Sequence, residues 1–279
     1  MFHLVPTLDH VVVNVRDRID DGAACYRRLG FTLTPRGYHT LGSMNHLAMF
    51  GTDYLELIAA PPGSTSRPEI LASPEGLNGL VFGTEDAAAT HFAMGKAGVA
   101  VFPPEEFSRP VTVQEGTRDA VFRTVRLMPG MVPAGRLYFC QHLTRDLVWR
   151  DAWRHHANGV TGVARAVVVA QDTADLGALF ARMFGPDAVR AIDGGCALTV
   201  GLSRFDVVSP ESFQAEFGDA APETHGRDSY MAALEFRTRS LDAAAAALDK
   251  GRIEGVRRLD GRIVVPARSA FGVTQAFCL

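Results

Sequence analysis

Two stretches within the first sixty residues carry side chains that could do chemistry. The first is a loop-like run rich in glycine and polar residues, in which His39, Asn45 and His46 offer imidazole and amide groups. Loops of this kind often carry substrate contacts, although asparagine and glycine also favour tight turns without any ligand. The second is Glu56, which lies between two leucines. On a strand, such a carboxylate faces water or, if it faces inward, needs a metal ion or a basic partner.

Several other chemistries find no support in the sequence. The four cysteines stand far apart and form no CxxC pair, which excludes a cysteine zinc cluster and argues against a disulfide framework. There is no GxSxG elbow, no GxxxxGK[ST] loop, no GxGxxG after a strand and no HExxH. The cysteines are Cys25, Cys140, Cys196 and Cys278.

The composition excludes some classes of binding partner. The 279 residues are 47% hydrophobic, and 28 basic residues against 31 acidic ones leave a net charge of -3. A protein that binds nucleic acid without sequence preference needs a basic face, so we expect no nucleic-acid partner. No apolar run approaches the roughly 20 residues that span a bilayer, and the first residues lack a basic segment and a cleavage pattern. The sequence therefore predicts a cytoplasmic protein without a membrane partner.

An internal repeat organises the chain. Four segments share the order apolar strand, short polar turn with an acid or serine, and helix, and each is followed by shorter strand-like runs. The repeated unit is therefore βαβββ, which predicts an α+β fold with curled, mostly antiparallel sheets and helices on one face. The four strand–helix segments are Leu8 to Phe31, Leu77 to Val99, Val163 to Gly185 and Met231 to Ile253.

The four units are expected to pair into two domains. A half-domain of this size must pair its sheet with another to bury one face. The loop from Trp149 to Gly162 offers a boundary, and Pro61 to Glu69 offers a linker inside the first pair. We therefore expect an N-terminal domain over residues 1–155 and a C-terminal domain over residues 156–279.

Particular stretches resemble the vicinal oxygen chelate superfamily, which includes glyoxalase I, extradiol dioxygenases and bleomycin-binding proteins. The chain begins its first unit with LDHVVVNV and closes it with DYLELI. The run HTLGSMNHLAMFGTDYLELIAA (residues 39–60) and the run CQHLTRDLVWRDAW (residues 140–153) are similar to the glyoxalase-like group within it. The resemblance implies two glyoxalase-like domains, each made of two βαβββ units, and it rests almost wholly on the first half of the chain.

The resemblance also implies a divalent metal ion in a cleft of the N-terminal domain, held by the first and last strands of each unit. His10 and Glu56 occupy those positions in the first unit. In the second unit, the first strand offers only Asn78 or Gly79, and the last strand offers Cys140 with His142 two residues on. Imidazole and carboxylate suit Fe, Mn, Ni or Zn. The implied ligand set is His10, Glu56 and His142, with Glu56 also able to act as the catalytic base.

Each of these side chains has a second interpretation. His10 could be a buried histidine bonded to its own loop, and Cys140 a plain core thiol. Asn78 would be a polar residue of the cleft. Trp149 would line the cleft wall or pack between the domains. The residues expected to bind the substrate are His39, Asn45, His46, Asn78 and Trp149.

The C-terminal half lacks such a ligand set. Arg165 stands at the position of His10 and Asp206 at that of Glu56. From this spacing we expect an Arg165–Asp206 salt bridge at the ancestral metal position. This domain would then be structural or would shape the cleft.

The sequence thus favours a glyoxalase-like metalloenzyme acting on a small oxygen-bearing substrate, in which the ion stabilises an enolate or oxyanion. Isomerase, lyase, hydrolase and dioxygenase chemistry stay open, since one scaffold supports many reactions. The alternative is a metal-free protein of the bleomycin-resistance type that sequesters a small molecule. The oligomeric state also stays open, with a homodimer as one option.

Overall fold

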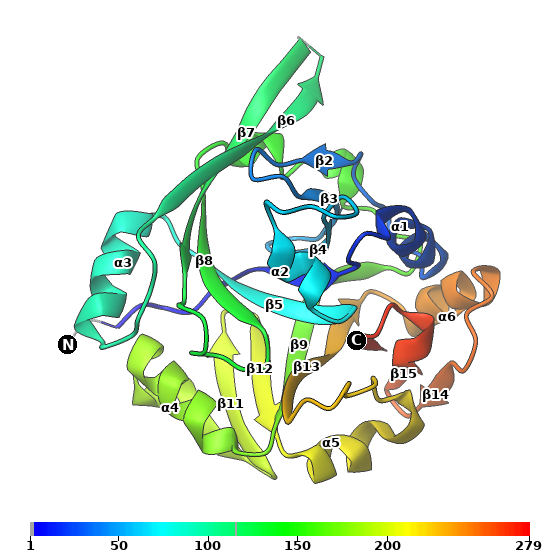
Figure 1. Ribbon diagram of the computed structural model, residues 1–279. Coiled ribbons are helices and arrows are strands. Elements are labelled where there is room, and N and C mark those ends of the chain that lie inside the picture. The colour runs from blue at the N-terminus through cyan, green and yellow to red at the C-terminus, as the bar shows by residue number, and fades with distance from the viewer. Residues whose placement is uncertain (1–2, 115) are drawn as a thin grey trace.

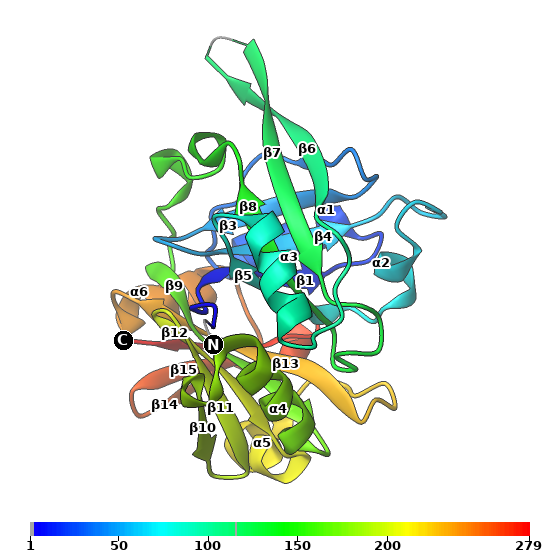
Figure 2. The same cartoon turned by 90° about the vertical axis from the view of Figure 1, so that its left-hand side faces the viewer.

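The computed structural model describes residues 3–114 and 116–279. It contains two eight-stranded sheets, one above the other in Figure 1, with helices along their outer sides. Figure 2 shows the same two layers from the side. Within the described residues, none of the helices has the length and apolar character needed to cross a bilayer.

The first sheet is built from two βαβββ units joined through a short helix, α2. Its elements are β1 (Leu8–Asn14), α1 (Ile19–Arg28), β2 (Gly37–Tyr38), β3 (Met44–Met49), β4 (Tyr54–Ala59), α2 (Pro68–Ala72), β5 (Gly76–Gly83), α3 (Ala87–Lys96), β6 (Glu105–Val113), β7 (Gly116–Arg126) and β8 (Arg136–His142).

The second sheet repeats this plan, with α5 joining its two units. Its elements are β9 (Val160–Ala170), α4 (Thr173–Phe184), β10 (Val189–Ile192), β11 (Gly195–Val200), β12 (Ser203–Val208), α5 (Pro210–Phe217), β13 (Ser229–Thr238), α6 (Leu241–Lys250), β14 (Arg257–Leu259), β15 (Arg262–Val265) and β16 (Thr274–Cys278). Between the sheets, 3-10 turns at Arg145–Leu147 and Asp151–Trp153 carry the chain from β8 to β9.

Strand order is the same in both sheets. The first runs β2-β3-β4-β1-β5-β8-β7-β6 and the second β10-β11-β12-β9-β13-β16-β15-β14. In each sheet the first strands of the two units pair antiparallel at the centre, and each pairs parallel with the last strand of its own unit. The predicted α+β fold of four βαβββ units is therefore confirmed. The proposed boundary at residues 155 and 156 falls between the two sheets.

Polar side chains in the turns before α3, α4 and α6 cap these helices. The Asp86 carboxylate accepts hydrogen bonds from two backbone N–H groups in the first turn of α3. The Asp172 side chain accepts one such hydrogen bond in α4, and the Ser240 hydroxyl accepts one in α6. Such caps satisfy backbone donors that the helix itself leaves free.

A shared core joins the two sheets. The Phe82 ring of β5 packs against Phe184 of α4 at a centroid distance of 4.7 Å, and Phe31 packs against Phe236 of β13 at 5.2 Å. These aromatic contacts bury large apolar areas and so contribute strongly to stability. They leave the opposite face of the first sheet to form a separate interior.

Strand alternation divides the side chains between these two interiors. On β1, Val11 and Val13 belong to the shared core, whereas Val12 belongs to the interior enclosed by the first sheet. On β4, Leu55 and Leu57 again point to the shared core. Because side chains alternate along a strand, His10 and Glu56 face the enclosed interior.

Candidate active site

His10 and Glu56 meet inside the first sheet. In the parallel pairing of β1 with β4, His10 lies beside Tyr54 and two residues before the level of Glu56. Their side chains converge, with His10 Nε2 3.7 Å from Glu56 Oε2. Both residues are buried, at 3% and 6% exposure, and both line a cavity of about 340 Å³. This volume suits a small molecule.

A bulge in β1 brings Asp9 to the same place. Leu8 and His10 pair with consecutive residues of β5, so Asp9 is the extra residue. Bulges of this kind re-aim side chains next to functional sites. The Asp9 carboxylate lies 2.5 Å from His10 Nδ1 and 3.1 Å from His142 Nε2. Asp9 therefore holds both imidazole rings.

The charge of Asp9 fixes the orientation of the proton on His10. Burial opposes ionisation, but the neighbouring His142 and His10 rings outweigh it and hold the pKa of the Asp9 carboxyl well below its usual value. An ionised carboxylate only accepts hydrogen bonds, so His10 donates from Nδ1. In the neutral imidazole, the Nε2 lone pair is then directed into the cavity, where the Tyr138 hydroxyl lies 3.1 Å away in position to donate to it.

Glu56 is held by two further groups. The Asn45 side-chain amide donates to Glu56 Oε1 over 2.6 Å, and His39 Nε2 lies 4.0 Å from the same oxygen. Burial alone would raise the pKa of Glu56, but His10, His39 and the Asn45 hydrogen bond together lower it. Glu56 is thus an ionised carboxylate whose second oxygen, Oε2, faces His10 and the cavity.

His39 also lines the cavity. Its Nδ1 lies 2.8 Å from the Ser43 hydroxyl, and its Nε2 lies 3.2 Å from the Asn45 amide nitrogen. Burial lowers the pKa of His39 to about 4, an effect that Glu56 only partly offsets. His39 is therefore neutral at pH 7 and orients the asparagine that holds Glu56.

Three other residues of the expected substrate-binding set lie behind the cavity wall. On β3, Asn45 and Leu47 face the cavity, so His46 faces the opposite side and bonds the Thr34 carbonyl oxygen at 2.8 Å. The Asn78 Oδ1 accepts a hydrogen bond from Arg136. Trp149 packs on His142 at 4.7 Å. None of His46, Asn78 and Trp149 is among the residues that line the cavity.

His142, the third ligand implied by the resemblance, faces Asp9 instead of Glu56. It lies on the same strand face as Tyr138 but farther along β8, and it lines a neighbouring pocket. Among the described residues, the group of three or more potential ligands within 4.8 Å of one another is Asp9, Cys140 and His142. Burial raises the pKa of the Cys140 thiol well above its usual value, so Cys140 is a protonated core thiol at neutral pH.

Strand register identifies the true counterpart of Glu56 in the second unit. Tyr54 pairs with His10 in the first unit, and Arg136 pairs with Gly79 in the second. Two residues later come Glu56 and Tyr138, respectively. The equivalent position is therefore Tyr138, which corrects the expectation that Cys140 occupies it. Gly79, with no side chain, stands at the position of His10.

Four residues that matter to this site escaped the sequence analysis: Asp9, Tyr138, Arg109 and Arg136. Alternation along β6 could have identified Arg109, because Phe107 and Val111 on either side of it also face inward. The same period on β8 places Arg136 and Tyr138 on one face with Cys140. The bulge that turns Asp9 inward left no comparable signal.

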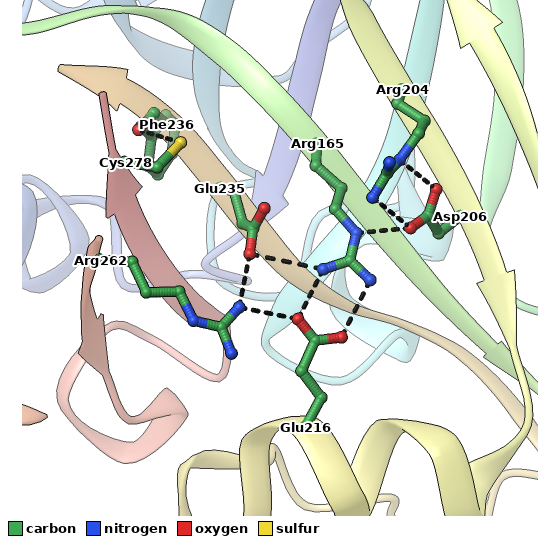
Figure 3. A network of polar contacts seen from close by, with 8 residues as sticks. All are labelled: Arg165, Arg204, Asp206, Glu216, Glu235, Phe236, Arg262 and Cys278. Carbon is green, nitrogen blue, oxygen red and sulfur yellow. Dashed lines mark hydrogen bonds and ion pairs between the residues drawn. The ribbon is translucent and has the colours of Figure 1, made fainter. Parts of the chain in front are cut away.

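In the C-terminal half, the equivalent position is filled by ions of opposite charge. Arg165 Nε donates to Asp206 over 2.6 Å, which confirms the expected salt bridge. Arg165 also bonds Glu216 at 2.7 Å and Glu235 at 3.4 Å, and Arg262 joins both glutamates, as Figure 3 shows. This network occupies the place where the first sheet has its cavity residues.

Comparison with known proteins identifies the family to which this fold belongs. A family described as a glyoxalase-like domain matches residues 8–184, which is more than half of the chain. The chain belongs to the glyoxalase-like domain family. Its fold is that of the vicinal oxygen chelate superfamily, as the sequence resemblance implied. A search of curated proteins gave no match.

Solved structures share the whole fold at low identity. A hypothetical protein from Staphylococcus aureus is 13% identical with a TM-score of 0.66, over 98% of this chain and 99% of that one. A triple mutant of 4-hydroxymandelate synthase from Streptomyces coelicolor is 12% identical with a TM-score of 0.57, over 98% and 92%. A fusion of a xylose isomerase-like TIM barrel with 4-hydroxyphenylpyruvate dioxygenase is 13% identical with a TM-score of 0.58, over 99% and 49%.

Proposed function

We propose that this glyoxalase-like protein is an enzyme that transfers a proton on a small oxygen-bearing substrate bound in the cavity of the first sheet. The observation that carries the proposal is the facing pair of His10 Nε2 and Glu56 Oε2, buried and 3.7 Å apart. In the neutral imidazole with its proton on Nδ1 toward Asp9, both atoms are acceptors. Two buried acceptors that face one another favour a proton or a cation between them.

These residues fit a divalent ion at this point. Bonds of about 2.1 Å from imidazole and carboxylate can span up to about 4.2 Å between the two ligand atoms, so the observed separation suits one shared ion. The bond from Asp9 to His10 Nδ1 is the outer contact that metal-binding histidines usually make. His10 and Glu56 would hold the ion, and Asp9 with His142 would support it. When bound, the ion would act as a Lewis acid on a substrate oxygen.

The chain's own residues supply the proton transfer. Glu56, ionised and with no hydrogen bond to Oε2 among the described residues, would release the ion and then accept the proton from a carbon next to a carbonyl group. Asn45 keeps the carboxylate turned so that Oε2 faces the cavity. The Tyr138 hydroxyl, whose pKa is raised by burial, stays protonated and would donate a hydrogen bond to the developing negative charge.

Deuterium exchange tests this proposal. The protein with Mn²⁺ would be mixed with 2-oxobutanoate or phenylpyruvate in D₂O, and loss of the proton signal next to the carbonyl followed by NMR. We expect exchange faster than in buffer, and a fall of at least about 100-fold in Glu56→Gln and His10→Ala. Exposed Glu254→Gln and His155→Ala are the matched controls. Exchange no faster than in buffer with either acid, or full exchange in Glu56→Gln, would contradict the proposal.

A second candidate is a protein that sequesters a small molecule without a metal. Gly79 and Tyr138 favour this candidate, because neither is a strong metal ligand. Of the four equivalent positions, those of His10 and Glu56 then hold the strong ligands. Elemental analysis of protein purified without chelator separates the two candidates. Near-stoichiometric transition metal that is lost in His10→Ala supports the enzyme. Less than about a tenth of an equivalent in both proteins supports sequestration.

A further inference from the structure

Two arginines in the cavity wall lack partners for part of their guanidinium groups. Arg109 is 4% exposed, and its Nε and Nη2 are buried without a hydrogen-bond partner among the described residues. Arg136 donates from Nε to Asn78 Oδ1 at 3.0 Å, but its Nη2 is buried and equally unpartnered. A buried charge without a partner is costly, so two in one cavity call for a function.

The other arginines of the cavity are already paired. Arg67 donates to Glu69 over 2.5 Å, and Arg126 lies 2.7 Å from Glu105. The lining as a whole holds four arginines and three glutamates. With those two pairs set aside, Glu56 is the remaining carboxylate of the lining against the two guanidinium groups of Arg109 and Arg136. The cavity therefore keeps an excess of positive charge, and a divalent ion at Glu56 would increase it.

Both groups lie within the electrostatic range of Glu56. Burial lowers the pKa of the Arg109 guanidinium, and the nearby Tyr54 and Glu56 offset only part of that effect. Burial likewise lowers the pKa of Arg136, again with a partial offset from nearby Tyr138 and Glu56. An arginine nevertheless stays charged in proteins. A ligand at His10 and Glu56 would thus lie near two guanidinium groups that each have a nitrogen without a hydrogen-bond partner among the described residues.

Much of the remaining wall is apolar. Around the arginines lie aliphatic and aromatic side chains, which suit the body of a ligand that carries its charge at one end. These side chains are Leu41, Phe102, Phe107, Phe122, Val132 and Leu137.

We propose that Arg109 and Arg136 bind the anionic head of the substrate, which is a small organic acid with a carboxylate or phosphate group and an apolar body. Guanidinium groups suit both heads because their donors match two oxygens at once. The inference rests on the cavity being the substrate site proposed above. It concerns binding only and needs no turnover.

Binding of three probes tests the inference by isothermal titration, with the protein as purified and again after dialysis against EDTA. The probes are benzoate, phenyl phosphate and the uncharged benzamide. We expect at least one anion to bind at least about 10-fold more tightly than benzamide in both samples. The tighter of the two anions identifies the head group. Equal binding of all three, or binding of none, would overturn the proposal.

Variants assign the effect to the two arginines. Arg109→Gln and Arg136→Gln should each weaken anion binding by roughly 10- to 100-fold, because a charge-assisted hydrogen bond is worth about 1.5–3 kcal/mol. Arg109→Lys, which keeps the charge, should fall between, and circular dichroism would verify that each variant folds. The control Arg118→Gln changes an exposed arginine and should leave binding within about twofold. Unchanged anion binding in both glutamine variants would contradict the assignment.

Glu56→Gln separates this inference from the proposed proton transfer. Removal of the carboxylate charge should leave anion binding equal or stronger, because it removes a repulsion, while deuterium exchange is lost. Anion binding that survives without exchange in the wild-type protein would refute only the proton transfer. Exchange without any preference for anions would refute only the role of the arginines.

Discussion

Tyr138 stands in the second unit at the position that Glu56 holds in the first. Each lies two residues after the residue that pairs with the equivalent position of its unit's first strand: Tyr54 pairs with His10, and Arg136 pairs with Gly79. At the four equivalent positions, the two βαβββ units therefore place one imidazole, one carboxylate, one phenol and one glycine. This asymmetry explains why the site offers two strong metal ligands where a symmetric pair of units could offer four.

Replacing Tyr138 with histidine should therefore complete a metal site. In Tyr138→His a second imidazole would join His10 and Glu56, giving two histidines and a carboxylate, the set common in mononuclear sites. We expect Co²⁺ to bind at least about 10-fold more tightly than in the wild-type protein, measured by visible absorption. Tyr138→Phe removes the hydroxyl without adding a ligand and should show no gain. Equal affinities in the two variants would argue against the register-based equivalence.

Asp9 should act through His10. In Asp9→Asn the negative charge that fixes the His10 proton on Nδ1 is lost, although the side chain keeps nearly the same shape. We expect Co²⁺ affinity to fall roughly 10- to 100-fold, as for other outer contacts of metal-binding histidines. Asp119→Asn, an exposed position on β7, is the control. Unchanged affinity in Asp9→Asn would show that His10 does not depend on its carboxylate partner.

The sequence predicted what periodicity and local motifs encode. Repeated strand–helix patterns were sufficient for the four units. The convergence of the His10 and Glu56 side chains followed from the resemblance and from strand alternation. The third ligand did not follow, because strand register decides whether Tyr138 or Cys140 is the equivalent of Glu56 in the second unit. Asp9 escaped because a bulge breaks the alternation on which such predictions depend.

The ion network of the second sheet should stabilise that half of the molecule. Arg165→Met would leave Asp206, which is 1% exposed, with Arg204 as its remaining partner and would weaken the pairing of Glu216. We expect the free energy of unfolding to fall by about 2 kcal/mol in urea titrations, since loss of the central guanidinium leaves the charges of Asp206 and Glu216 only partly compensated.

Two comparisons check that interpretation. The double variant Arg165→Met/Asp206→Leu should lose less than the sum of the single changes. Arg118→Met, which breaks an exposed pair with Asp146, should cost at most about 1 kcal/mol. A loss in Arg165→Met no larger than in Arg118→Met would mean that the network contributes little to stability.

Asp53 should make stability depend on pH. Burial raises the pKa of this carboxyl to about 6, although the hydrogen bond from the Val163 backbone N–H lowers it in part. A folded pKa above the unfolded value of 3.8 means that its contribution is fully present below that value and is lost as pH rises through 6. Asp53→Asn should thus match the wild-type protein near pH 3 and exceed it by about 3 kcal/mol at pH 8. Urea titrations across pH, with Asp119→Asn as control, would show the opposite trend or none if Asp53 ionises freely.

The most direct test of the shared site of His10 and Glu56 is anomalous X-ray diffraction from crystals grown with MnCl₂. The account predicts a manganese peak within about 2.3 Å of both His10 Nε2 and Glu56 Oε2, and no peak there in crystals of Glu56→Gln. A peak enclosed by Asp9, Cys140 and His142 instead, or none in the cavity, would contradict it.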